Sequence, residues 1–184
     1  MRIFGIDPGS ERTGYGCVRT DGSRHTLVAC GAIKTSASAT FPEKLLVIHS
    51  RLATLLSECR PDAVAIENLF HAVNARSALR LGHARGVAML AAVESGVQVF
   101  EYTPAEVKRA VVGYGRAEKP QVQQMIKLLL RLPEPPSPHD AADALAVAIC
   151  HIHSQPRRRT SDTTPLPAAG RVRKSATSWR HYRP

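Results

Sequence analysis

The sequence predicts an α/β domain on a five-stranded mixed sheet flanked by helices, with a three-strand antiparallel meander plus two parallel strands. Three observations support this class. The chain opens with a short apolar run that ends on Asp7 and a Pro8-Gly9 turn, as expected for a strand buried on both faces. Two further strand patterns follow with no helix between them. Later strand patterns alternate with helical ones, which is typical of parallel pairing.

The meander is predicted from alternation and a turn signal. Residues 14–20 alternate as a strand does, Asp21-Gly22 favours a hairpin, and residues 25–33 form the returning strand. Asp7 would then stand at the carboxyl end of a central strand, where open α/β sheets place their functional sites.

A crossover unit comes next. Thr40 and Glu43 have capping-box spacing, and apolar residues then recur at helical period to about residue 58. Residues 63–67 are a short buried strand that closes on Glu67. Because a helix between two strands implies a right-handed crossover and parallel pairing, we expect Glu67 to end beside Asp7 at the same edge.

A long helix is predicted over residues 73–95, with two distinct faces. One face carries a basic stripe of Arg76, Arg80 and His83 at i, i+4, i+7. The other carries small residues spaced by four: Ala78, Gly82 and Gly86. Such spacing lets another backbone approach closely, so this face should pack tightly on the sheet or on a second subunit.

The remaining elements are a fifth strand over residues 97–102, helices over 104–112 and 119–132, and a last helix over 137–151. Ser137 suits the N-cap of this last helix and Pro138 its first position. Asp140 and Asp143, three residues apart, would share one face. The other residues are small and apolar, so the helix should pack flat against the sheet.

Charge and composition limit the class of protein. The net charge is +10, and seven Arg and one Lys against one Asp place +7 of it in residues 155–184. We therefore expect one folded domain over residues 1–154, a basic and largely disordered tail over 155–184, and a polyanionic partner. The four cysteines form no CxxC pair and are expected to be reduced. The sequence contains no apparent secretion signal or membrane span, so we expect a cytoplasmic protein.

Four carboxylates, Asp7, Glu67, Asp140 and Asp143, could converge if the last helix starts over the strand ends. Four like charges together are costly unless a cation lies among them. Oxygen-only ligands suit Mg²⁺ or Mn²⁺, and two such ions can hold both oxygens of a phosphodiester displacement. Three of the acids also have simpler explanations: Asp7 could cap its own turn, Asp140 could complement a helix dipole, and Asp143 could be a solvated surface residue. Glu67 is different, because a carboxylate that closes a buried strand needs a partner.

The motifs together resemble the RuvC family of Holliday junction resolvases across residues 1–153. The resemblance is carried by residues 6–9 (Ile-Asp-Pro-Gly), 66–70 (Ile-Glu-Asn-Leu-Phe), 75–79, Gly82, Gly86, 111–115, 117–119 and 140–146. It implies a ribonuclease H-like fold and a homodimer that cuts four-way DNA junctions in recombination and repair. It also implies a divalent-metal requirement, with two Mg²⁺ per site expected and Mn²⁺ able to substitute.

The resemblance also assigns residue roles. It implies that Asp7, Glu67, Asp140 and Asp143 bind metal, that Lys108 and Lys119 lie near the scissile phosphate, and that Phe70 unstacks bases. Some relatives have His where Asp140 stands, so the neighbouring His139 could assist or merely start the helix. A branch-migration helicase complex is the partner the family implies. From charge alone, Arg76, Arg80 and the tail would hold backbone phosphates.

Other classes of function stay open from the residues alone. A sugar-kinase-like ATPase would need a second domain and a second Gly-rich phosphate loop, and neither is evident in the sequence. A nuclease of the same fold acting on RNA would use similar acids. A non-catalytic binder of DNA junctions would tolerate loss of the acids.

Overall fold

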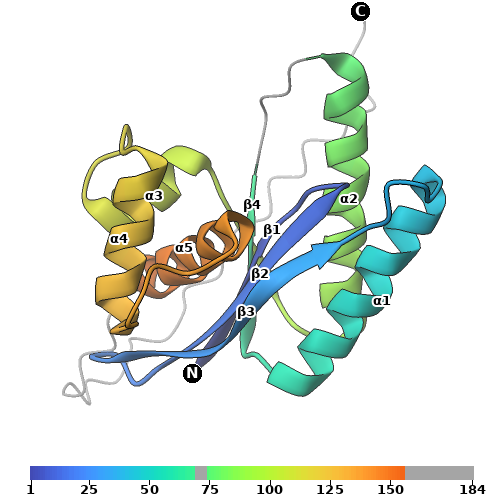
Figure 1. The fold of residues 1–184 in the computed structure, drawn as a ribbon. Coiled ribbons are helices and arrows are strands. Elements are labelled where there is room, and N and C mark those ends of the chain that lie inside the picture. Colours follow the sequence, from blue (N-terminus) through green and yellow to red (C-terminus); the bar gives the residue numbers. More distant parts are fainter. Residues whose placement is uncertain (69–73, 156–184) are drawn as a thin grey trace, which may run out of the picture.

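The computed structural model describes residues 1–68 and 74–155, and it arranges them as a single sheet between two helical layers (Figure 1). The elements in chain order are β1 (Arg2–Asp7), β2 (Arg12–Thr20), β3 (His25–Lys34), α1 (Phe41–Cys59), β4 (Ala63–Glu67), α2 (Ala75–Glu94), β5 (Val99–Tyr102), α3 (Pro104–Val112), α4 (Lys119–Leu130) and α5 (His139–Ser154). The predicted tail lies outside the described residues apart from its first position, and Phe70 lies outside them too.

The sheet has the predicted mixed topology. Its strand order is β3-β2-β1-β4-β5. Strands β1, β2 and β3 pair antiparallel as a meander, whereas β4 pairs parallel with both β1 and β5. Helices α3, α4 and α5 cover one face and α1 and α2 cover the other (Figure 1). The predicted fold class is therefore confirmed.

Alternation along β1 assigns its side chains to the two layers. Phe4 and Ile6 are fully buried in the core shared with α1 and α2, while Ile3 is buried in the core shared with α3, α4 and α5. Side chains two residues apart on a strand share a face. Asp7 therefore lies on the α5 side of the sheet.

Helix α5 sits unusually close to the sheet because glycines lie beneath it. A Cβ at Gly5 would be 2.0 Å from the carbonyl oxygen of Ala144, and one at Gly14 would be 2.0 Å from that of Asp140. Gly14 is the β2 partner of Asp7 in the ladder. The glycines thus bring the first turn of α5 directly over the end of β1, which confirms the flat packing predicted for this helix.

The predicted start of α5 is wrong by one position. Ser137 was expected to be the N-cap, but Pro138 occupies that position with an extended backbone (φ −71°, ψ 176°) and the helix begins at His139. The fixed φ of proline is compatible with an N-cap as well as with the first helical turn. The side chain of Pro138 makes no capping hydrogen bond.

The small-residue face of α2 does not pack on the sheet, so that half of the prediction is wrong. Ala84, Ala88, Ala91 and Ala92 bury the opposite face of the helix. A Cβ at Gly82 or Gly86 would meet no atom within 4 Å among the residues described. The four buried alanines already let α2 pack closely against the core, whereas the glycines face away from it.

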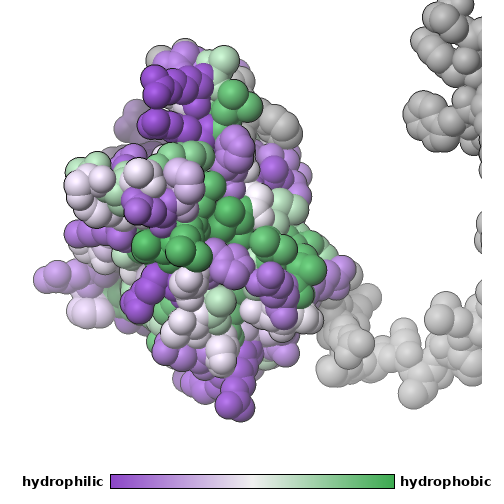
Figure 2. All heavy atoms as spheres, turned by 90° about the vertical axis from the view of Figure 1, so that its right-hand side faces the viewer, coloured by the Kyte–Doolittle hydropathy of each residue, from purple (hydrophilic) through white to green (hydrophobic). Residues whose placement is uncertain are grey.

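Figure 2 shows apolar side chains exposed across the face formed by α1 and α2. The exposed large apolar residues of these two helices are Leu46, Val47, Leu79, Leu90 and Val93. None of the helices in the two described segments is both long and apolar enough to span a bilayer.

Candidate active site

The site begins with two carboxylates on neighbouring parallel strands. Ile6 of β1 pairs with Ile66 of β4, so the next residues, Asp7 and Glu67, end adjacent strands at the same edge. Both are partly buried. The predicted adjacency of these two acids is confirmed.

Asp143 of α5 joins this pair from above the sheet. Burial, followed by the negative charges of Glu67 and Asp143, raises the pKa of Asp7 to about 8. Burial and the charge of Asp143 also raise the pKa of Glu67. Carboxyls that resist ionisation because they lie together are typical of functional sites and of cation sites.

Two lysines contribute positive charge near these acids. The Lys119 Nζ, at the start of α4, donates to the Asp143 carboxylate at 3.0 Å. This hydrogen bond raises the pKa of Lys119, and Lys108 of α3 lies close enough for its charge to lower the pKa of Glu67. The side chain of Lys119 is 72% exposed, so it stands at the solvent side of the acids.

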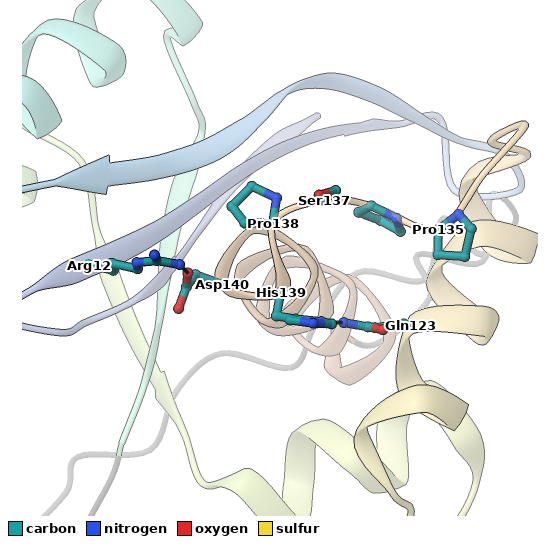
Figure 3. Close-up of a pocket in the computed structure, with 8 residues that line it drawn as sticks. Arg12, Gln123, Pro135, Ser137, Pro138, His139 and Asp140 are labelled. Carbon is teal, nitrogen blue, oxygen red and sulfur yellow. Dashed lines mark hydrogen bonds and ion pairs between the residues drawn. The ribbon is translucent and has the colours of Figure 1, made fainter.

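Asp140 takes a different partner from Asp143. One oxygen of Asp140 lies 3.9 Å from a guanidinium nitrogen of Arg12, the first residue of β2. Figure 3 shows this pair beside His139, whose Nδ1 is hydrogen bonded to the side-chain amide nitrogen of Gln123. No pattern in the sequence points to Arg12 or Gln123, because their contacts with Asp140 and His139 of α5 exist only in the folded chain.

The donor set fits a divalent cation, although its present arrangement is not a closed coordination shell. Among residues 1–68 and 74–155, no three Asp, Glu, His or Cys side chains are arranged to hold one metal ion. Asp143 and Asp140 instead contact Lys119 and Arg12. Burial, followed by the neighbouring carboxylates, raises the pKa of both Asp7 and Glu67. An oxygen-binding cation among these carboxylates would offset both effects.

The basic stripe on α2 lies on a different element from the acids. Arg76 and Arg80 are exposed. The Arg80 guanidinium lies 5.4 Å from the ring centre of Phe41, and His83 meets the same ring edge-on. Within the described residues, no hydrogen bond or ion pair links either arginine to the four acids.

Comparison with known proteins shows the family of the chain. The family model described as "Crossover junction endodeoxyribonuclease RuvC" matches residues 3–151. A protein of that name from Pelobacter propionicus is 52% identical over 184 residues, covering 100% of both chains. Another from Ruminiclostridium cellulolyticum is 55% identical over 154 residues, which are 84% of this chain and 93% of that one.

A solved structure has the same fold as this chain. Thermus thermophilus RuvC in complex with a Holliday junction substrate superposes with a TM-score of 0.78 at 39% identity, covering 82% of this chain and 92% of that chain. The residues matched by the family model include the strand edge and the helix that carry the acids. The chain therefore belongs to the RuvC family of crossover junction endodeoxyribonucleases.

Proposed function

We propose that this protein resolves Holliday junctions in recombination and DNA repair by hydrolysing one phosphodiester in each of two opposed strands. The observation that carries the proposal is the placement of Asp7 and Glu67 at the ends of neighbouring parallel strands, with Asp143 of α5 and its partner Lys119 close to both. Support comes from the family and from the junction-bound relative of the same fold.

Members of this family are metal-dependent nucleases. Asp7, Glu67, Asp140 and Asp143 would hold the cation, with two Mg²⁺ per site as our proposal and Mn²⁺ as a substitute. When bound, the cation would supply Lewis-acid activation of water and stabilise the leaving oxygen. The products would be a 5′-phosphate and a 3′-hydroxyl, which a ligase can rejoin.

The protein's own residues position the DNA and neutralise its charge. Lys119 can exchange Asp143 for the scissile phosphate because it lies on the exposed side of that acid. Lys108, near Glu67, adds a second positive charge. Arg76, Arg80, Phe70 and the basic tail would bind the arms or the crossover outside the site. His139, held by Gln123, stands at the helix start and could orient Asp140.

A homodimer explains how two opposed strands are cut. The outward face of α2 holds an apolar cavity of about 600 Å³ lined by Ala78, Leu79, Gly82, His83, Gly86, Val87 and Leu90. Small residues spaced by four allow the same helix of a second copy to approach closely, in a two-fold contact. Two sites would then face the two-fold symmetry of a four-way junction. A branch-migration helicase complex and a cytoplasmic location complete the proposal.

The test uses an immobile synthetic four-way junction labelled on one strand at a time. With Mg²⁺, cuts should fall at symmetric positions on two opposed strands, be sealed by a ligase and vanish with chelator. The matched linear duplex should remain uncut.

An RNA hairpin and an RNA–DNA hybrid distinguish the alternatives. Preferential cutting of either RNA substrate would replace junction resolution with RNA processing. Junction binding without cutting in any divalent metal would indicate a non-catalytic binder.

A further inference from the structure

Two of the four acids have a basic partner that approaches from the solvent side. Lys119 is 72% exposed where it meets Asp143, which is 22% exposed. Arg12 is 57% exposed where it meets Asp140, which is 28% exposed. In both pairs the cation comes from another element and covers the outer side of a carboxylate on α5.

Arg12 also lines a cavity beside the acids. This cavity measures about 440 Å³ and is lined by Arg12, Gln123, Pro135, Pro136, Ser137, Pro138, His139 and Asp140 (Figure 3). Its proline wall contributes no backbone N–H groups. Arg12 is the one permanently charged cation among these eight residues.

The Arg12–Asp140 pair is easy to exchange for another anion. Its separation of 3.9 Å is long for a charge-assisted hydrogen bond, and its exposure leaves it screened by water. A guanidinium binds a phosphate through two parallel hydrogen bonds, which a pair of this length does not provide. A phosphate that enters the cavity would therefore compete well for Arg12.

We propose that Arg12 binds a backbone phosphate of the cleaved strand in this cavity. Arg12 would act beside Asp140 as Lys119 is proposed to act beside Asp143. On DNA binding, the Arg12 guanidinium passes from Asp140 to the phosphate and leaves the carboxylate to the cation site. This inference rests on the proposed function and assigns a substrate contact to that same site.

Junction affinity measures this contact directly. Binding of a fluorescent four-way junction is followed by anisotropy in chelator across a range of salt concentrations. Arg12→Gln should weaken binding about tenfold and reduce the salt slope by about one, because one phosphate contact is lost. Arg12→Lys should keep the salt slope and recover part of the affinity. Arg19→Gln, which removes the same charge seven residues along β2, should change affinity less than twofold.

The position of the contact can be mapped with single neutral methylphosphonates placed along the cleaved strand. At one position near the cut, wild type should lose as much affinity as the Arg12→Gln variant loses with normal DNA. At that position the variant should lose nothing further, since the two changes remove one interaction. Losses that add at every position would overturn the inference.

Two further results would overturn it while leaving junction resolution intact. One is wild-type affinity and salt slope for Arg12→Gln in a preparation whose wild type cuts junctions. The other is weaker Mn²⁺ binding without DNA together with an unchanged salt slope, because Arg12 would then only hold Asp140 in place. A wild type that neither binds nor cuts junctions would overturn the proposed function and this inference with it.

Discussion

At the scale of single residues, Asp7 is held where its charge is disfavoured. Its pKa of about 8 in the folded chain lies well above its ordinary value of 3.8. Folding with the carboxyl neutral costs nothing below that ordinary value, and the cost grows as pH rises until the folded pKa is passed. The buried position of Asp7 therefore lowers the stability of the folded protein at neutral pH.

This cost predicts that Asp7→Asn is more stable than wild type in chelator. The gain should be small at pH 4, rise with pH, and reach on the order of 5 kcal/mol above pH 8, since the shift is about four pKa units at about 1.4 kcal/mol each. Thermal and urea denaturation across this pH range measure it. Asp62→Asn, at the other end of β4, is the control. A less stable Asp7→Asn protein at pH 8.5 would mean that the ionised carboxylate makes favourable structural contacts.

Proton and cation compete for the same carboxyl, which gives a second prediction. Because Asp7 must lose its proton to bind a divalent ion, Mn²⁺ affinity should fall as pH drops below about 8, by up to roughly tenfold per unit. Calorimetric titration at pH 6, 7 and 8 measures this dependence. Affinity that stays constant over this range would show that Asp7 does not carry the proton.

At the scale of elements, the close packing of α5 on the sheet decides whether Asp140 and Asp143 lie near Asp7 and Glu67. Gly14→Ala places a methyl group against the Asp140 carbonyl oxygen, so we expect a loss of about 1–3 kcal/mol of stability. Cutting should fall further than that loss explains, because α5 must shift. Gly31→Ala is the control, since the three atoms nearest its Cβ would belong to the ring and hydroxyl of Tyr15 and not to α5. Normal cutting by a folded Gly14→Ala protein would contradict this.

The sequence predicts elements better than it predicts contacts. Periodicity and turn signals located every strand and helix of the described residues within a few positions, and strand connectivity placed Glu67 beside Asp7. Their spacing predicts that Asp140 and Asp143 share one face of α5. In the structure each contacts a different basic side chain, Arg12 for Asp140 and Lys119 for Asp143. The sequence does not predict the contact between Arg12 and Asp140. These residues meet only after the meander has formed and α5 has packed on the glycines beneath it. No local pattern encodes that juxtaposition.

At the scale of the whole molecule, the proposed cutting of two strands would depend on a dimer formed through α2. Gly82→Arg should abolish the dimer while leaving the monomer as stable as before or up to about 1 kcal/mol more stable, because Gly82 is exposed and is a poor helix former. Sedimentation gives the oligomeric state, and junction cutting should shift from paired cuts to single nicks. Leu128→Arg on α4 is the control. A dimeric Gly82→Arg protein would place the interface elsewhere.

The most direct test of the account compares binding and cutting of one junction by wild type and Asp7→Asn. The variant should bind the junction with wild-type affinity and cut it at least a thousandfold more slowly. That reduction corresponds to a loss of about 4 kcal/mol of transition-state stabilisation. Asp62→Asn should match wild type in both measurements. Cutting at the wild-type rate by Asp7→Asn, or loss of junction binding from a folded variant, would contradict the claim that this sheet edge hydrolyses DNA.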